Sequence, residues 1–427
     1  MRAKSPALLT DRYEMTMLTA ALRDGSAGRQ CVFEAFGRRL PDGRRYGVVA
    51  GTGRLLELIA DFRFDTDTVA WLQHSGTVDE PTAEYLRSYR FGGDVEGYTE
   101  GELYFPDSPI LTVTGTFAEA VVLETLVLSV LNHDCAIASA AARMTTAAAD
   151  RPIIEMGSRR THEQAAVAAA RAAYLAGFTA TSNLAAGRRY GIATTGTAAH
   201  SFTLLHDDEE AAFASQAAAL GAGTTLLVDT YDITQGIEKA VRAVGAELGA
   251  IRIDSGDLGV LAKQARAQLD ALGNEHTRIV VSGDLDEYSI AALAASPVDV
   301  YGAGTAVVTG SGAPTAQLVY KLVEVDGRPV AKRSEHKASH GGRKTAIRRH
   351  RATGTAVEET ISAAPLTTGP DDRVLQRPLL RDGERVADLP TLDESRAYCA
   401  AALITLPWEG LKLSKGEPAI PTRVIER

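Results

Sequence analysis

The chain has little cysteine and no long apolar segment. Only three cysteines, Cys31, Cys135 and Cys399, occur among 427 residues, and none belongs to a CxxC pair. This spacing excludes a disulfide framework, argues against a cysteine zinc site and is typical of a reducing compartment. No window approaches about 18 uninterrupted apolar residues, and the N-terminus lacks the apolar core of a signal peptide. We therefore expect a cytoplasmic protein that does not enter a membrane.

The chain also lacks an excess of basic charge and two common nucleotide-binding motifs. Its formal net charge of -9 argues against a nucleic-acid partner, although a local basic pocket could still hold an anionic substrate. It contains no GxxxxGK[ST] loop, so any ATP must be held without one. Val307 replaces the third glycine of a GxGxxG motif that would begin at Gly302, which disfavours a dinucleotide site.

A repeated pattern of a short β-type run, a polar turn and an Ala-rich helical run is present between about residues 153 and 305. The runs lie at 153–156, 178–181, 191–195, 225–229, 250–254, 278–282 and 298–302. Polar motifs follow nearly every run, and reactive groups of an α/β barrel lie at the C-terminal ends of its strands. The pattern predicts an irregular α/β barrel, with a doubly wound sheet as the alternative.

The segments on either side of this pattern predict a second α/β domain. Before about residue 120, β-type runs at 30–36, 94–104 and 109–114 flank helical stretches, and after about residue 319 the chain returns to β-type runs. We predict an N-terminal domain over 1–120, a barrel over 121–320 and a C-terminal segment, 321–427, that packs back on the first domain.

His200 is the first candidate for chemistry. It lies in a stretch rich in Gly, Thr and Ser, where backbone and hydroxyl groups can hold the ring and leave one nitrogen free as a nucleophile or proton carrier. A hydrogen-bonded structural histidine is the alternative on the residues alone.

Arginines at predicted strand ends indicate an anionic substrate. Arg159 and Arg160 follow a strand through Gly157-Ser158, and paired guanidinium groups suit carboxylate or phosphate. Arg252 lies within an apolar strand two residues before Asp254, so both point to one face of the sheet. The anionic partner of Arg252 is then either Asp254 or a substrate carboxylate.

Carboxylates and glycines complete the candidate site. Asp254 with Asp257, and Asp284 with Asp286, follow two neighbouring strands, where they could organise Mg²⁺ together with substrate phosphates. Solvated turns rich in Asp and Gly are the alternative. The glycines of the segment 302–305 would let backbone N–H groups approach a phosphate.

The order and wording of these motifs resemble the nicotinate phosphoribosyltransferases, over most of the chain. The matching segments are TDRYEMTM at 10–17, GSRR at 157–160, GTAAHSF at 196–202, IRIDSGDL at 251–258, VSGDLDE at 281–287 and YGAGT at 301–305. The resemblance implies a barrel of the type II phosphoribosyltransferase kind. It also implies ATP-coupled transfer of phosphoribosyl from 5-phosphoribosyl 1-diphosphate to nicotinate in NAD biosynthesis, with Mg²⁺ and a phosphorylated His200.

The same resemblance assigns roles to individual residues. Tyr13 would stack on the pyridine ring, from a neighbouring subunit of a homodimer. Thr197 and Arg252 would contact nicotinate. The groups that would hold ribose and phosphates are Arg159, Arg160, Gly283, Asp284, Gly302, Gly304 and Thr305. Asp229, at another strand end, would shape the phosphate region, and Asp254 and Asp257 would bind the metal.

Three other functions remain open on the sequence. The related nicotinamide enzymes carry Asp where this chain has Ser182, so Ser182 favours the acid over the amide. A quinolinate enzyme would need more basic groups, and a non-catalytic phosphosugar-binding protein would not need His200. The basic run 332–351 resembles a family segment but has Glu335 and Gly341 where proline is usual; it is interpreted as a solvated face or a phosphate clamp.

Overall fold

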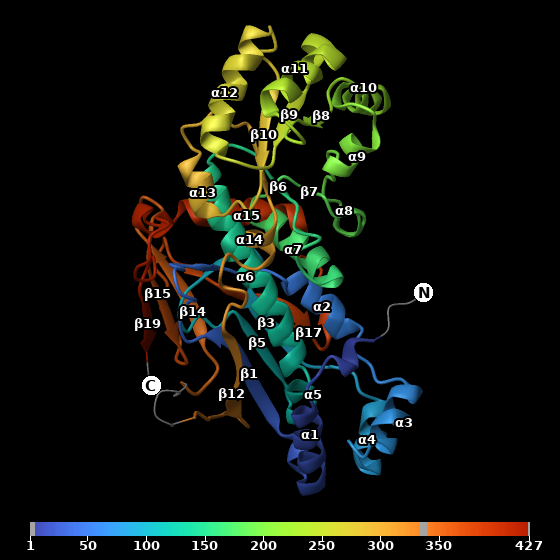
Figure 1. Cartoon of the computed structure of the whole chain (residues 1–427). Coiled ribbons are helices and arrows are strands. Elements are labelled where there is room, and N and C mark those ends of the chain that lie inside the picture. The colour runs from blue at the N-terminus through green and yellow to red at the C-terminus, as the bar shows by residue number, and fades with distance from the viewer. Residues whose placement is uncertain (1–4, 333–339, 426–427) are drawn as a thin grey trace. The chain divides into compact units, whose positions relative to one another are not determined.

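The computed structural model describes residues 5–332 and 340–425 and divides into two compact units (Figure 1). One unit comprises Met1–Ser139 with Thr315–Arg427, and the other comprises Ala140–Pro314. The boundary between the units follows Ser139 and falls within the residue range of α6 (Glu124–Ala148). The domain bounds at residues 120 and 320 remain a prediction from the sequence.

The first unit is built on a seven-stranded antiparallel sheet to which both ends of the chain contribute. Its strands run in the order β13-β12-β1-β5-β3-β17-β18. Their bounds are Arg328–Pro329, Leu318–Val325, Gln30–Gly37, Leu111–Thr116, Asp94–Tyr98, Gln376–Arg381 and Glu384–Arg385. Because β12 pairs with β1 and β17 pairs with β3, the N- and C-terminal segments form one sheet, which confirms the predicted second α/β domain.

Smaller sheets and helices complete this unit. Strands β16 (Arg373–Val374), β14 (Thr345–His350), β15 (Ala356–Ser362) and β19 (Thr422–Ile425) form a four-stranded sheet, and β2 (Gly47–Val48) pairs with β4 (Leu103–Tyr104). The α-helices are α1 (Arg12–Asp24), α2 (Thr52–Ala60), α3 (Thr66–His74), α4 (Glu80–Arg87), α5 (Phe117–Val121), α15 (Leu392–Ile404) and the first part of α6. Among the described residues, the run 117–148 is long and apolar enough to cross a membrane, and two thirds of its most apolar window is buried inside the protein.

Two cations of the basic run in the C-terminal segment, Lys344 and Arg348, lie in the interior of this unit. Residues 333–339, which include Glu335, lie outside the described residues. Arg348 is fully buried and donates hydrogen bonds to Glu102 and Glu359, while Lys344 donates to the buried Glu34. These cations are therefore held in buried ion pairs, and neither the solvated-face nor the phosphate-clamp interpretation fits Lys344 or Arg348.

The second unit is a curled parallel sheet of six strands with helices in the connections. The strand order is β7-β6-β11-β10-β9-β8, and every pair is parallel. The bounds are Ala180–Thr181, Ile153–Glu155, Val300–Ala303, Arg278–Ser282, Ala250–Ile253 and Thr225–Leu227. This half-barrel confirms the predicted irregular α/β barrel.

Helices connect these strands, and one predicted strand is wrong. The helices are α7 (Glu163–Leu175), α8 (Leu184–Tyr190), α9 (His200–Leu205), α10 (Glu209–Leu220), α11 (Ile233–Val244), α12 (Leu258–Ala271), α13 (Glu287–Ala292) and α14 (Thr305–Val308). The run 191–195 makes only an isolated bridge between Thr181 and Thr194. Gly191, with φ of 72°, ends α8 in the left-handed conformation, so the run begins as a helix cap.

Candidate active site

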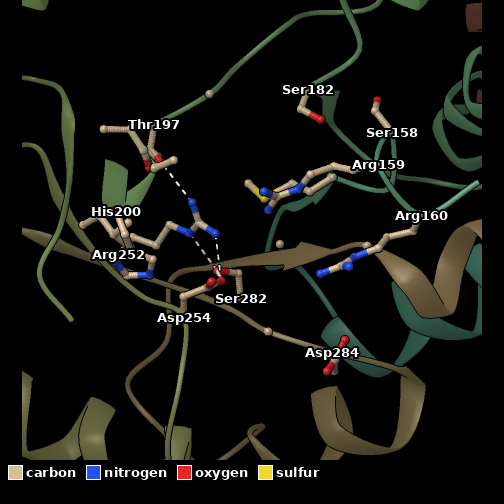
Figure 2. A pocket seen from close by; sticks show the side chains of 18 of the residues that line it. Ser158, Arg159, Arg160, Ser182, Thr197, His200, Arg252, Asp254, Ser282 and Asp284 are labelled. Carbon is tan, nitrogen blue, oxygen red and sulfur yellow. Dashed lines mark hydrogen bonds and ion pairs between the residues drawn. The ribbon is translucent and has the colours of Figure 1, made fainter. Parts of the chain in front are cut away.

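A cavity of about 490 Å³ opens at the C-terminal ends of the parallel strands of the second unit (Figure 2). Its size is that of a small-molecule site. Twelve residues singled out from the sequence line it: Arg159, Arg160, Ser182, Thr197, His200, Arg252, Asp254, Gly283, Asp284, Gly302, Gly304 and Thr305. They follow or end five different strands, or lie on the segment before α9 or at its first residue, so the strand order brings together residues far apart in the sequence.

Arg252 occupies the centre of a polar cluster in this cavity. Its Nε donates to Ser282 Oγ at 2.7 Å, Nη1 to Thr197 Oγ1 at 2.9 Å and Nη2 to Asp254 Oδ1 at 2.7 Å (Figure 2). Burial opposes the charge of Asp254, but the Ser282 hydrogen bond and the charges of Arg252 and His200 leave the pKa of Asp254 below its ordinary value. Asp254 is therefore a carboxylate at neutral pH, and Arg252 is held in one position.

His200 is the first residue of α9, and two neighbours fix its ring. Nδ1 lies 3.1 Å from Thr230 Oγ1, and Nε2 lies 3.8 Å from Asp229 Oδ1. Asp229 is buried and accepts hydrogen bonds from Asp254 N and Ser255 Oγ through its other oxygen. The histidine side chain is 43% exposed. The ring is thus both oriented and accessible, as a nucleophile or proton carrier must be.

The turn that carries Arg159 and Arg160 is fixed by a buried carboxylate. Glu155, at the end of β6, accepts hydrogen bonds from Gly157 N and Thr181 Oγ1. Burial raises the pKa of Glu155 in spite of these two bonds. Asn183 Nδ2 donates to Ser158 Oγ at 3.0 Å, so the turns after β6 and β7 are tied together. Figure 2 shows the side chains of Arg159 and Arg160 across the cavity from His200.

Close packing leaves little room for a Cβ at two of the strand ends. Gly283 has φ of 107°, and a Cβ there would lie 2.3 Å from Asp254 O. A Cβ on Gly302 would lie 2.8 Å from Met156 Sδ. Gly283 and Gly302 line the cavity, and because neither has a side chain, an anion can approach the main chain there.

Two predicted site residues do not line the cavity. Asp257 accepts a hydrogen bond from Val260 N and caps α12. Tyr13 lies on α1 in the first unit, where burial and the nearby carboxylates Glu124 and Glu14 raise its pKa to about 12. Among the described residues, no group of three or more His, Cys, Asp or Glu side chains gathers where it could hold a metal ion. The metal role of Asp257 and the stacking role of Tyr13 remain predictions.

The sequence reasoning missed seven residues that line the cavity. They are Met156, Ser158, Gly196, Ala198, Ala199, Leu227 and Ser282. Most adjoin predicted residues and could have been found from that position alone. The carboxylate of Asp229 lies beside His200, with Oδ1 3.8 Å from Nε2, and its role in shaping the phosphate region remains a prediction.

Comparisons with known proteins agree with this arrangement. Residues 8–132 match the family model for the nicotinate phosphoribosyltransferase (NAPRTase) N-terminal domain, and residues 137–312 match that for the quinolinate phosphoribosyl transferase C-terminal domain. The nicotinate phosphoribosyltransferase pncB1 of Mycobacterium tuberculosis is 65% identical, over 98% of this chain and 95% of that protein. The chain belongs to the nicotinate phosphoribosyltransferases.

More distant members of this family share the whole architecture. The human nicotinate phosphoribosyltransferase is 30% identical, over 96% of this chain and 93% of that protein. The crystal structure of human nicotinic acid phosphoribosyltransferase superimposes with a TM-score of 0.85, at 27% identity and with 98% of each chain covered. The resemblance drawn from the sequence motifs is confirmed, and it extends to both units.

Proposed function

We propose that the chain transfers phosphoribosyl from 5-phosphoribosyl 1-diphosphate to nicotinate, giving nicotinate mononucleotide and diphosphate in NAD biosynthesis, and that ATP is consumed through a phosphorylated His200. The observation that carries this proposal is that one cavity combines the fixed guanidinium of Arg252, the accessible His200 and glycine-containing turns at the strand ends. The family membership of the chain supports the same substrates.

The proposed reaction needs little acid-base chemistry. The pyridine nitrogen bonds to C1 of the ribose while the bond from C1 to the diphosphate oxygen breaks, so positive charge develops at C1 and negative charge on the leaving group. Arg159 and Arg160 are exposed on the cavity, and no hydrogen bond or ion pair within the described residues engages their side chains. They and the backbone of the turn 302–305 hold the diphosphate.

In the proposed reaction Mg²⁺ binds together with the substrate. Asp254 and Asp284 present carboxylates to the cavity, and Mg²⁺ takes few protein ligands when phosphate oxygens supply the others. The residues present fit an ion that arrives with the diphosphate. Its chemistry would be to neutralise charge on the leaving group.

We further propose a cytoplasmic homodimer in which Tyr13 of a second copy stacks on the nicotinate ring, without nucleic-acid or membrane partners. Ser182 lines the cavity, and a hydroxyl accommodates the substrate carboxylate better than the Asp of nicotinamide enzymes would. Nicotinate is therefore favoured over nicotinamide. Of the three arginines that line the cavity, Arg252 is the one whose side chain is held by hydrogen bonds within the described residues. One fixed guanidinium suits one carboxylate, which favours nicotinate over the dicarboxylate quinolinate.

The test measures diphosphate release by the purified protein with nicotinate, 5-phosphoribosyl 1-diphosphate and Mg²⁺, with and without ATP. We expect release that requires nicotinate and rises with ATP, and we expect His200→Ala to lose that rise. His206→Ala is the matched control, because His206 lies at the end of the same helix and outside the cavity lining. Turnover with nicotinamide or quinolinate in place of nicotinate would overturn the substrate assignment.

A further inference from the structure

Ser282 connects the two charged groups at the centre of the cavity. Its hydroxyl accepts from Arg252 Nε and donates to Asp254 Oδ1, the oxygen that also accepts from Arg252 Nη2. Ser282 is the last residue of β10 and is 3% exposed. The hydroxyl is thus fully used, as donor and as acceptor, within the site.

The pairing of the parallel strands places Ser282 beside Arg252 and Asp254. Strands β9 and β10 pair in register with Val280 beside Arg252 and Val281 beside Ile253. Side chains two residues apart share a face of a strand, so Ser282 lies on the face that carries Arg252 and Asp254. On its other side Ser282 pairs with Gly302 of β11, and a Cβ on that glycine would lie only 3.1 Å from Ser282 Cβ.

The three hydrogen bonds leave two N–H groups of Arg252 for a ligand. A guanidinium has five N–H groups, and Ser282, Thr197 and Asp254 take one each from Nε, Nη1 and Nη2. Within the described residues, one N–H on each Nη nitrogen therefore remains for a ligand. Two such donors match the two oxygens of a carboxylate.

We propose that Ser282 is a positioning residue that sets the preference for an acid substrate by locking Arg252 in the orientation that offers this pair of donors. The inference rests on the proposed use of Arg252 as the nicotinate carboxylate receptor. Without the hydroxyl, Nε loses its anchor and only Thr197 and Asp254 hold the guanidinium, so its two remaining donors are no longer kept in one orientation.

Ser282→Ala tests the role through two readouts. In steady-state kinetics we expect the KM for nicotinate to rise about tenfold, while kcat and the KM for 5-phosphoribosyl 1-diphosphate stay within threefold. In direct binding by calorimetry, we expect affinity for benzoate, a ring carboxylate that cannot react, to fall by a similar factor. Benzamide, its neutral counterpart, should bind the variant and the wild type alike.

Ser296→Ala is the matched control, because Ser296 is also a buried serine of this unit but lies outside the cavity lining. Equal benzoate affinity in wild type and Ser282→Ala would overturn the proposal, as would an equal loss of benzoate and benzamide binding, which indicates general disorder of the site. A wild-type protein whose benzoate affinity depends on Ser282 but that does not turn over nicotinate would refute the proposed function and leave the positioning role standing.

Discussion

Gly157 lies in the turn that carries Arg159 and Arg160, where close packing leaves no room for an added methyl group. A Cβ at this position would lie 2.1 Å from Val308 Cγ1, 2.9 Å from Glu155 Oε1 and 3.0 Å from Gly304 O. Carbon atoms in contact are separated by about 3.5–4.0 Å, so Val308 would have to retreat by roughly 1.5 Å. Val308 is itself buried and belongs to α14, the short helix that begins at Thr305 directly after Gly304.

Gly157→Ala should therefore displace two phosphate-facing turns at once. Overpacking of this kind costs about 1–3 kcal/mol of stability, which corresponds to a Tm lowered by several degrees. A displacement on the order of 1 Å in groups that position a substrate reduces kcat/KM by up to about 100-fold. We expect the loss chiefly in the KM for 5-phosphoribosyl 1-diphosphate, because both turns face the proposed phosphate region.

Thermal unfolding and diphosphate release on the same preparations measure both effects. Gly223→Ala is the control, since Gly223 is an exposed glycine of the same unit, and its Cβ would have no atom within 4 Å. The control should match the wild type in Tm and in both KM values. If Gly157→Ala also matched the wild type in both, the close packing of the turn at Gly157 against α14 would not be a requirement of the site.

Three further outcomes are expected. Ser182→Asp should raise the KM for nicotinate about tenfold in the diphosphate assay, because a carboxylate would face the substrate carboxylate; an unchanged KM would contradict its selectivity role. Burial raises the pKa of Glu14 to about 7 from 4.5, so the folded state holds a proton that the unfolded chain releases, and stability falls as pH rises from about 4.5 through 7. Glu14→Gln should therefore be more stable than wild type at pH 8, by on the order of 1–3 kcal/mol in urea unfolding, with the difference lost near pH 4.5. Arg348→Met should lower the free energy of unfolding by about 3–5 kcal/mol, because Glu102 and Glu359 would remain buried without their cation. Urea unfolding measures this loss, and a midpoint equal to that of the wild type would refute it.

The parallel half-barrel could be predicted because its signals are local. Each strand is a short apolar run followed by a polar turn, and the Ala-rich connections between strands have a helical composition. The run 191–195 shows the limit of this reasoning. Its composition suits a strand, but Gly191 is used as the left-handed cap of α8, and a backbone conformation of this kind is set by the preceding helix rather than by the run itself.

The antiparallel sheet of the first unit was predictable only in outline. Which strand of the C-terminal segment pairs with which strand of the N-terminal segment depends on contacts across hundreds of residues, such as Cys31 beside Val325. The basic run shows the same limit, because Arg348 looks like a solvated or phosphate-binding residue until Glu102 and Glu359 are placed beside it.

Within the site, the residues that face a ligand were easier to predict than the neighbours that hold those residues in position. Arg252, Asp254 and His200 stand out because charged or polar side chains at strand ends suggest chemistry. Ser282 and Asp229 act on these groups from neighbouring strands, and strand order decides which neighbours meet: β9 lies between β8 and β10. Asp229 therefore reaches the turn after β9 from one side, and Ser282 reaches the same turn from the other. Because both contacts converge on Asp254, which accepts a hydrogen bond from Arg252, the orientation of Arg252 depends on side chains from the ends of three neighbouring strands, a dependence that the sequence motifs do not display.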